Sequence, residues 1–312
     1  MIFLNIFNKY LSIFAVILLI GIIVSVYIWN ISRPPCKFEM YILNTKGKPS
    51  IFIWTPNDER ILINGGANSD IIRNLTSILP FYSRRIDTVI VTSDDENDVT
   101  GLVDVISRYN VGKVIIPKIT AESLGFSLAS TTDQIYEILL DKVNQLKIPI
   151  KEVERGDIIM TNTNTKLNAE VLFPVDQFKY SKSSLPEMVL KISYGNTSIL
   201  LLGNVGLKAQ KSLIASTRTE FNNCSSNCLT SDVLVVSHNF STSSLSASLI
   251  NAVHPKYLVY SQTVSNLSFR LSSGPKPPKV DPIYMIPYKN RFNIKQKNTV
   301  MVLSDGTSIE VI

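Results

Sequence analysis

The feature that most constrains this fold is an order of segments that occurs twice. Each half of the chain contains a hairpin, an apolar strand, a polar loop, a helix and a second apolar strand. Two such halves stack naturally as helix, sheet, sheet, helix, which buries both sheets against each other. We therefore predict an α/β fold of four layers. The matching segments are 51–66, 86–93 and 112–116 in the first half, and 190–204, 231–238 and 255–260 in the second.

The loop over 92–98 is the main candidate for a functional site, because it places four carboxylates directly after the apolar strand that ends at Val91. Polar loops at the carboxyl ends of buried strands are where α/β proteins usually place binding groups. In the stacked arrangement the loops after Val91 and Val236 meet at one end. Carboxylates alone suit Mg²⁺ or Ca²⁺. The competing interpretation is a solvated loop in which Asp94 or Asp98 caps the following helix.

The N-terminal segment is distinct from the rest, because residues 11–29 carry no charge and are almost entirely apolar. This length of helix crosses the ~30 Å hydrocarbon core of a bilayer. A cleaved signal peptide is the competing interpretation, but no small-x-small cleavage site follows. We predict a tail over 1–10, a transmembrane anchor over 11–29, a linker over 30–37 and one domain over 38–312. This makes the protein a single-pass cell-membrane protein, and the balance of flanking lysines and arginines leaves the side of the domain open.

Charge and cysteine content are less informative. The net charge of +6 is spread along the chain, so a solvated basic face is favoured over a nucleic-acid groove. Three cysteines do not form a disulfide framework. Cys224 and Cys228 are compatible with one small disulfide or with two free thiols, and metal binding there is disfavoured because no second pair exists. The C-terminal region is locally basic, with Tyr288 and Phe292 interleaved among Lys276, Lys279, Lys289, Arg291, Lys295 and Lys297.

Several segments carry a likeness to a known family. They read L-P-F-Y at 79–82, R-R-I-D at 84–87, G-L-V-D-V at 101–105, R-Y-N-V-G-K-V at 108–114, S-D-V-L-V-V-S-H at 231–238 and A-V-H-P-K-Y at 252–257. In this order they resemble the metallo-β-lactamase-fold domain of the ComEC type. That domain is attached to bacterial DNA-uptake channels and occurs alone in related hydrolases. The resemblance runs from about Phe38 to Thr307 and implies a four-layer αβ/βα sandwich.

The metal-binding motifs of that family are altered in this chain. Active members carry a T-H-x-[HD]-x-D-H loop whose side chains hold one or two metal ions, zinc or manganese, that activate water. Here 92–98 reads T-S-D-D-E-N-D. Ser93 therefore stands for the first histidine, Asn97 for the metal-binding aspartate and Asp98 for the last histidine.

Two further positions of the family pattern also differ. Asn204 stands for the carboxylate of a T-G-D motif, and of the two histidines in S-H-H-G-S only His238 remains. An early D-V-G-Q-G-D turn reads N-T-K-G-K-P over 44–49. Asp95, Asp98 and His238 are the weak candidates for a metal site. His254 is not among them, because it lies at a helix end and suits capping or packing there.

We therefore predict a catalytically degenerate protein that acts as a binding or structural module, with no assigned catalytic residue and no cofactor. Its protein partner is not identified by the sequence. One alternative is a metal-dependent hydrolase, of the phosphodiesterase or nuclease kind, with a remodelled site. The other is a non-cleaving DNA-binding module linked to DNA uptake. The vestigial motif positions are Ser93, Asp95, Asn97, Asp98, Asn204 and His238.

Overall fold

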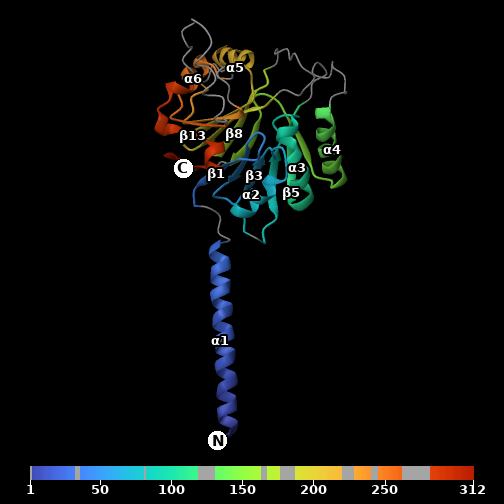
Figure 1. Cartoon of the computed structure of the whole chain (residues 1–312), viewed down its shortest axis with the longest axis vertical. Helices are drawn as coiled ribbons and strands as arrows, with labels where there is room; N and C mark the ends of the chain where they lie inside the picture. Colours follow the sequence, from blue (N-terminus) through green and yellow to red (C-terminus); the bar gives the residue numbers. More distant parts are fainter. Residues whose placement is uncertain are drawn as a thin grey trace.

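A computed structural model of the chain describes residues 2–31, 36–80, 82–118, 131–162, 167–175, 187–219, 228–239, 245–261 and 282–312. These residues form two mixed β-sheets that pack face to face, with helices on both outer faces (Figure 1). The four-layer αβ/βα sandwich that the internal repeat predicts is therefore confirmed.

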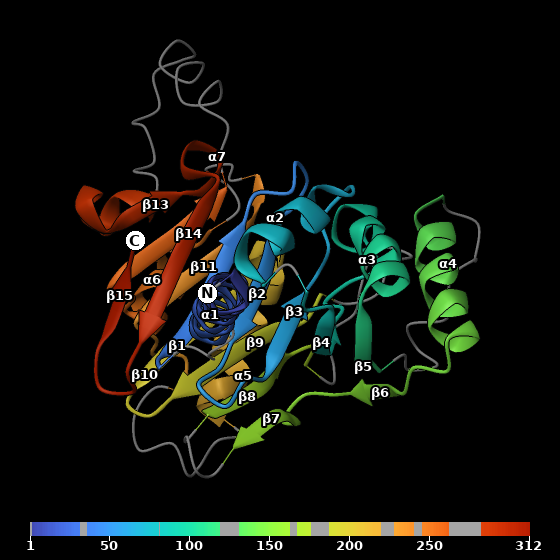
Figure 2. The ribbon, with the colours of Figure 1, turned by 90° about the horizontal axis from the view of Figure 1, so that it is seen from below.

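The first sheet has eight strands in the order β15-β14-β1-β2-β3-β4-β5-β6, seen from one end of the molecule in Figure 2. Strands β1 to β3 pair antiparallel, and β3 to β6 pair parallel. Strand β14 pairs antiparallel with β1 and with the last strand β15, so both ends of the domain lie in this sheet. The bounds are β1 Phe38–Leu43, β2 Ser50–Trp54, β3 Arg60–Ile63, β4 Arg85–Ile90, β5 Asn110–Pro117, β6 Ile150–Val153, β14 Thr299–Ser304 and β15 Ile309–Val311.

The second sheet has seven strands in the order β13-β12-β11-β10-β9-β8-β7. It repeats the change of direction of the first sheet, because β8 to β10 pair antiparallel and β10 to β13 pair parallel. The repeat in the sequence is thus a repeat of topology. The bounds are β7 Ile158–Asn162, β8 Leu167–Phe173, β9 Val189–Tyr194, β10 Thr197–Gly203, β11 Val233–Asn239, β12 Tyr257–Ser261 and β13 Arg291–Asn293.

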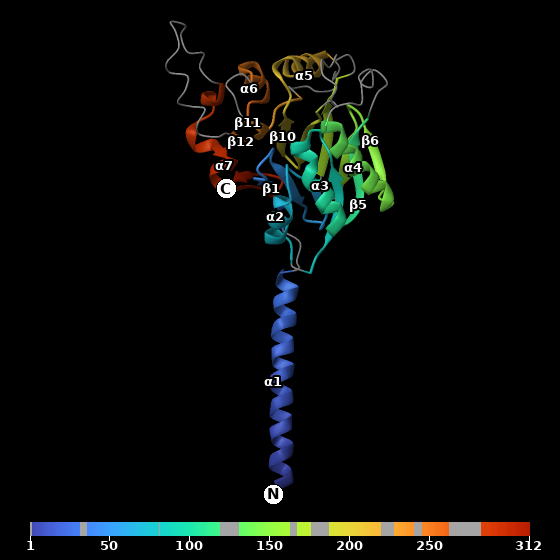
Figure 3. The same cartoon turned by 45° about the vertical axis from the view of Figure 1, so that its right-hand side comes forward.

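Three apolar cores separate the four layers. The central core joins the two sheets through alternate strand residues such as Ile53 and Ile61 from the first and Leu190 and Val235 from the second. A second core lies between the first sheet and its helices, and a third between the second sheet and its helices (Figure 3). The first set is α2 Asp70–Ile78, α3 Glu96–Arg108 and α4 Thr131–Gln145, and the second is α5 Leu207–Thr219 and α6 Ala247–Val253.

Glycines position α3 close to the turn that follows β3. A side chain on Gly101 would collide with the carbonyl oxygen of Gly65, and the N–H of Gly101 donates to the carbonyl oxygen of Gly66 at 3.0 Å. Gly66 itself has φ +74°, a conformation that glycine adopts without strain. This close approach brings the N-terminus of α3, and the loop before it, against the carboxyl ends of β3 and β4.

The N-terminal helix α1, Ile2–Ile31, lies apart from the sandwich (Figure 1). Its described side chains are those of residues 13–27, and the apolar ones are exposed. Within the described part of the chain, no helix is both long and apolar enough to cross a membrane. The anchor predicted over 11–29 is therefore not supported by the structure.

The cysteines are resolved in part. Cys36 is a free, exposed thiol, and Cys228 is disulfide-bonded. Cys224 lies outside the described residues.

Candidate functional site

The loop between β4 and α3 is buried at the carboxyl end of the first sheet. Asp98 has no exposed surface, and Ser93 is only 4% exposed. The side-chain amide of Asn64, at the end of β3, donates to Thr92 Oγ1 at 2.7 Å and to Asp98 Oδ1 at 3.1 Å. The backbone carbonyl of Asp98 accepts the N–H of Gly65 at 2.6 Å. The solvated loop of the competing interpretation is therefore wrong, because this loop is hydrogen-bonded to the strand beside it.

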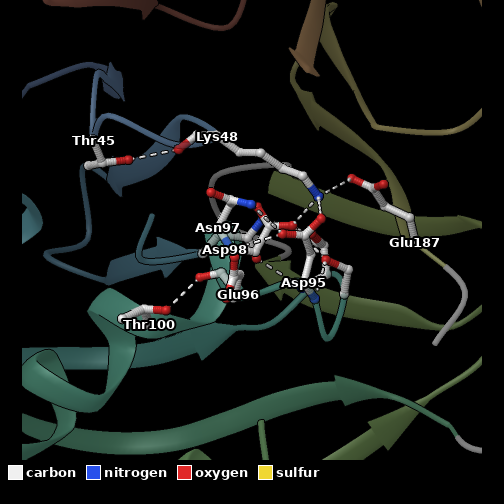
Figure 4. Close-up of polar contacts among 11 residues, drawn as sticks. Thr45, Lys48, Asp95, Glu96, Asn97, Asp98, Thr100 and Glu187 are labelled. Atoms are coloured by element: carbon white, nitrogen blue, oxygen red, sulfur yellow. Dashed lines mark hydrogen bonds and ion pairs between the residues drawn. The ribbon is translucent and has the colours of Figure 1, made fainter. Parts of the chain in front are cut away.

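Lys48 enters the loop from the turn between β1 and β2 (Figure 4). Its ammonium nitrogen Nζ lies 2.6 Å from Asp98 Oδ2, 3.2 Å from Asp95 Oδ2 and 3.9 Å from Glu187 Oε1. The Lys48 side chain is 6% exposed. One ammonium thus faces three carboxylates inside the protein, and we call these four residues the Lys48 cluster.

The turn that carries Lys48 is held in place by its own contacts. Thr45 Oγ1 donates to the carbonyl oxygen of Lys48 at 2.7 Å. A Cβ on Gly47 would lie 2.8 Å from Cβ of Ala67 and 3.2 Å from Cβ of Asn97, so the turn packs directly on the start of α3. Because the backbone is fixed on both sides of Lys48, its long side chain is directed into the loop.

Glu187 brings the second sheet into the same cluster, because it lies two residues before the start of β9 at Val189. The N–H of Met188 donates to the carbonyl oxygen of Thr92 at 2.8 Å, which ties this segment to the β4–α3 loop. The backbone N–H of Asn204 bonds the Glu187 carboxylate. Gly203 leaves room for that carboxylate, since a Cβ there would lie 2.6 Å from Oε1. Oε1 has no hydrogen-bond partner among the described residues, and it faces Nζ of Lys48.

Burial and charge act in opposite directions in the Lys48 cluster. Burial disfavours the charge of Lys48, but Glu187, Asp98 and Asp95 outweigh it and raise the lysine pKa above its usual value. Burial raises the pKa of Glu187 to about 8 and raises that of Asp98, against the attraction of the ammonium. Burial also acts on Asp95, but Lys48 and the N–H groups of Asn97 lower its pKa.

The predicted motif residues are brought together only in part. Ser93 Oγ donates to Asp98 Oδ2 at 2.5 Å, and Asn97 donates through its backbone and side-chain N–H groups to Asp95 Oδ1 at 2.8 and 2.9 Å. Asn204 contributes its backbone N–H to the site, through the hydrogen bond to Glu187. The side chain of His238, in β11, lies outside the described residues.

Two details of the sequence interpretation change. The residue that caps α3 is Asp95, whose Oδ1 accepts the N–H of Asn97, and not Asp94 or Asp98. Asp98 lies within the first turn of α3 and points inward to Lys48. His254 is the C-cap residue of α6 with φ 54° and is exposed, as expected for a residue at a helix end.

Sequence reasoning missed Lys48 and Glu187. Lys48 lies in a turn rich in glycine, proline and lysine, where a charged residue is normally solvated. Glu187 follows a segment with no motif of its own. The one signal for this turn is that Lys46 and Lys48 stand where the D-V-G-Q-G-D turn of the resembled family has its glycines, and it does not distinguish the buried lysine from the exposed one. No signal distinguishes Glu187 from other surface glutamates.

The residues present do not fit a catalytic metal ion. Such an ion needs several nitrogen, sulfur or oxygen ligands with room at their centre. At the centre of these three carboxylates stands the ammonium of Lys48. Within the described ranges, no three or more histidine, cysteine, aspartate or glutamate side chains are grouped so that they could hold a metal ion.

A second candidate surface lies near the C-terminus, over η2 Pro282–Met285, η3 Tyr288–Asn290, β13 and α7 Ile294–Lys297. The guanidinium of Arg291 lies 5.0 Å from the ring centre of Tyr284 and 5.7 Å from that of Tyr288, which is 84% exposed. Nζ of Lys297 lies 4.9 Å from the ring centre of Phe292. The stretch 282–304 contains no acidic residue. We call this the C-terminal basic surface: Tyr284, Tyr288, Lys289, Arg291, Phe292, Lys295 and Lys297.

No family model and no curated protein matches this chain. Solved structures to which it is similar include the metallo-β-lactamase fold protein YhfI from Bacillus subtilis, at 9% identity and TM-score 0.43, covering 72% of this chain and 85% of that one. A diphosphatase of the PhnP family gives 11% identity and TM-score 0.41 over 72% of this chain and 85% of that one. The diiron β-hydroxylase CmlA from Streptomyces venezuelae gives 14% identity and TM-score 0.44 over 72% of this chain, which spans 45% of CmlA. At such low identities and TM-scores, no activity, metal or substrate is transferred from them to this chain.

Proposed function

We propose that this protein is a catalytically degenerate metallo-β-lactamase-fold protein of the ComEC-like type, which acts as a binding or structural module and not as a hydrolase. The observation that carries the proposal is the ammonium of Lys48 among three carboxylates. A metal ion at such a place activates water by coordinating it and lowering its pKa. An ammonium group has no open coordination position, so it neutralises the carboxylates without generating a nucleophile.

Neutral side chains at the motif positions support the same proposal. Ser93 donates a side-chain hydrogen bond to Asp98, and Asn97 donates one to Asp95, so both side chains bond within the loop. Asn204 contributes a backbone N–H to Glu187. These contacts use the polar groups at the motif positions within the cluster itself, which favours a structural role.

The test is a metal analysis of the purified full chain combined with an activity assay. The protein is incubated with Zn²⁺ or Mn²⁺, freed of unbound ions by gel filtration and analysed by mass spectrometry of the elements. Hydrolysis of bis(p-nitrophenyl) phosphate is measured in parallel. We expect far less than one ion per chain and no hydrolysis above buffer. Stoichiometric metal with chelator-sensitive hydrolysis that Asp95→Ala abolishes would instead establish the hydrolase alternative.

A second candidate function is non-cleaving binding of single-stranded DNA, and the C-terminal basic surface is the observation that favours it. Exposed tyrosines and closely placed cations are what base stacking and phosphate contacts use together. Full-length protein is titrated into a fluorescent oligonucleotide at low and at moderate salt. Binding that weakens steeply with salt supports this function. Absence of binding at low salt contradicts this function.

We also propose that α1 attaches the domain to a cell membrane. The support is the uncharged sequence over 11–29 and the exposure of the apolar side chains described on α1, such as Phe14 and Ile17. The full chain is mixed with lipid vesicles, and the vesicles are separated by flotation and washed with high salt and alkaline carbonate. Retention on the vesicles supports attachment, and recovery of the protein in the wash contradicts it.

A further inference from the structure

We propose that a polar cavity on the outer face of the second sheet is a binding site for the phosphate group of a small water-soluble molecule. The cavity has a volume of about 460 Å³ and lies where β10, β11 and β12 begin. Three segments of the chain line it: the β9–β10 hairpin, the residues just before β11 and the residues between α6 and β12. This cavity is separate from the Lys48 cluster, and its assignment does not rest on the proposed function.

The cavity and the Lys48 cluster lie at opposite ends of the same strand. Glu187 of the cluster is bonded by the backbone N–H of Asn204, which follows the end of β10. The cavity instead surrounds Thr197, the first residue of β10. A strand of seven residues spans roughly 20 Å. A small molecule in the cavity therefore does not reach the Lys48 cluster.

The floor of the cavity is a row of polar residues on neighbouring chain segments. The row consists of Ser193, Ser198, Asp232 and Lys256. Ser193 pairs with Ser198 across the hairpin. The backbone N–H of Asp232 donates to the carbonyl oxygen of Ser198, and that of Lys256 donates to the carbonyl oxygen of Asp232, both at 2.9 Å. These bonds fix the order of the row across the sheet.

This row marks the place where the outer face of the sheet changes from apolar to polar. Side chains two residues apart on a strand share a face. Two residues further along β10, β11 and β12, the same face carries leucines that pack in the core shared with α5 and α6: Leu200, Leu234 and Leu258. The polar row therefore lies just beyond the part of the sheet that the helices cover, and the cavity opens there.

The lining of the cavity carries more positive than negative charge. It includes Lys191 and Lys256, and Asp232 is the one acidic residue among the described residues that line it. Oδ2 of Asp232 accepts the backbone N–H of Ser198 at 2.8 Å. Burial lowers the pKa of Lys191, against the attraction of Glu170 and Asp232. An anion bound beside this partly buried ammonium would compensate its charge, so the lining favours an anionic ligand.

Several neutral donors around the same cavity are available to an anion. Among the described residues, the side chains of Ser193, Asn196 and His254 have no hydrogen-bond partner. Their hydroxyl, amide and imidazole groups can all donate to an oxygen atom. A phosphate group offers several acceptor oxygens together with negative charge, and charge-assisted hydrogen bonds of this kind are the strong ones. Phosphate therefore fits both the charge and the donors of the cavity.

Contacts within the domain hold the walls of the cavity in place before any ligand binds. A side chain on Gly195, which has φ 57°, would collide with the carbonyl oxygen of Gly306. The backbone N–H of Asn196 donates to the same oxygen at 2.7 Å. Nζ of Lys191 donates to the carbonyl oxygen of Cys228 at 2.8 Å. A site whose groups are already positioned loses little entropy when it binds a ligand.

The position of the cavity favours a soluble molecule over a lipid headgroup as the source of the phosphate. Helices α5 and α6 lie on the side of the sandwich opposite to α1 (Figure 1). The cavity is on the face of the second sheet that these two helices cover in part. It is therefore turned away from a membrane that holds α1.

The experiment titrates glycerol 3-phosphate into the full-length protein by isothermal titration calorimetry, with glycerol as the ligand control. Wild type is compared with Lys191→Met, Lys256→Gln and Lys211→Gln. Lys211 is an exposed lysine of α5 that does not line the cavity, so its variant is the matched control for loss of one charge. We expect wild type to bind the phosphate ester saturably and not to bind glycerol.

The variants should differ in a fixed order. Lys191→Met removes a charged donor from the cavity and should weaken binding about 10- to 100-fold. Lys256→Gln removes an exposed charge and should weaken it by up to about fivefold. Lys211→Gln should leave the affinity unchanged. Absence of saturable binding to wild type at millimolar concentrations overturns the site, and so does an affinity that Lys191→Met and Lys256→Gln both leave unchanged.

Asn196→Asp covers the case in which Lys191→Met does not fold. The substitution keeps the shape of the side chain, lies in an exposed turn and places a negative charge at the cavity. It should keep the Tm of wild type and weaken binding about fivefold, the scale of two like unit charges about 4 Å apart in water. An unchanged affinity in this variant contradicts the assignment.

Vesicles with and without phosphatidate separate the two sources of a phosphate group. Because α1 is present in every variant, retention on the vesicles is compared between wild type and Lys256→Gln. Equal retention supports the soluble ligand, whereas phosphatidate-dependent retention that only wild type shows overturns it in favour of a lipid headgroup. Metal content and hydrolysis test the proposed function, so the two conclusions can fail separately.

Discussion

Lys48 and Glu187 come from opposite sheets of the sandwich, and their charged groups face each other at 3.9 Å inside it. Asp98, at 2.6 Å from the same ammonium, is the closer partner. Because Glu187 lies farther from the ammonium than Asp98 does, its negative charge is the least compensated of the three. Its protonation should therefore be visible in the stability of the whole domain.

The first prediction concerns pH. Burial raises the pKa of Glu187 to about 8, above the value near 4.5 of an unfolded glutamate. The folded state then holds a proton that the unfolded state has lost, so this contribution to stability is complete below pH 4.5 and disappears as the pH rises through 8. The free energy of unfolding in urea should fall from pH 5 to pH 8 in wild type.

The matched variant for this prediction is Glu187→Gln, which is neutral throughout that range. Its free energy of unfolding should decline less between pH 5 and pH 8 than that of wild type. A remaining slope is expected, because burial raises the pKa of Asp98 in the same direction. Parallel pH profiles for wild type and variant would contradict the assignment of the proton to Glu187.

The second prediction separates the two roles of Asp95. Asp95→Ala removes the N-cap of α3 together with one partner of Lys48, and should cost about 1–2 kcal/mol in unfolding free energy. Asp95→Asn keeps a capping oxygen, and two carboxylates still face the ammonium, so it should cost less than half as much. Ser246→Ala, which removes the cap of α6, serves as a control for capping alone. Equal losses in Asp95→Asn and Asp95→Ala would show that charge, and not capping, dominates.

The third prediction tests the close approach of α3 to the turn after β3. Gly101→Ala places a methyl group against the carbonyl oxygen of Gly65 and the carbonyl of Asn68, which are backbone atoms that cannot move aside cheaply. Although alanine favours helices, we expect a loss of about 1–3 kcal/mol or more. Gly206→Ala, where nothing lies within 4 Å of the new Cβ, should stay within about 0.5 kcal/mol of wild type. Thermal unfolding of both variants measures these losses of stability and tests the prediction.

The fourth prediction concerns the C-terminal basic surface. If single-stranded DNA stacks on this surface, Tyr288→Ala should weaken binding by about 5- to 100-fold, the range for loss of one base–aromatic stack. Lys289→Ala should instead reduce the salt dependence of binding, because one phosphate contact is lost. Lys118→Ala, which removes an exposed ion pair with Glu154, is the control in fluorescence anisotropy. Unchanged affinity in Tyr288→Ala would place any binding elsewhere.

The fold follows from the sequence to a large extent, because its main elements repeat and their apolar residues alternate or run at helical spacing. Strands such as β4 and β11 were expected close to their observed bounds, and α3 lies where a helix was expected between two apolar strands. The helix α5 and the edge strand β6 were not among the expected elements, although α2 and β13 hold the equivalent places in the other half. The pairing of β14 with β1 was also not expected, since nothing local indicates a partner so distant in the chain.

The site was predictable in its place but not in its chemistry. The acidic loop after β4 identifies the correct end of the sheet, and Asp95 and Asp98 do lie in the cluster. The partner that decides what those carboxylates do is Lys48, which tertiary contacts alone bring to them. A charge in a turn normally remains in water, and only the fixed backbone of residues 45–48 directs this one inward.

The pairing of β1 with β14 also has a consequence for synthesis of the protein. The strand Phe38–Leu43 leaves the ribosome early, whereas the strand beside it, Thr299–Ser304, is made roughly 260 residues later. Until then one side of β1 presents unpaired backbone groups, which are a template for aggregation. The first half of the domain therefore cannot complete its sheet as a nascent chain. The first sheet can therefore be completed only when the polypeptide is nearly finished. Its early strands have to be protected from aggregation until then.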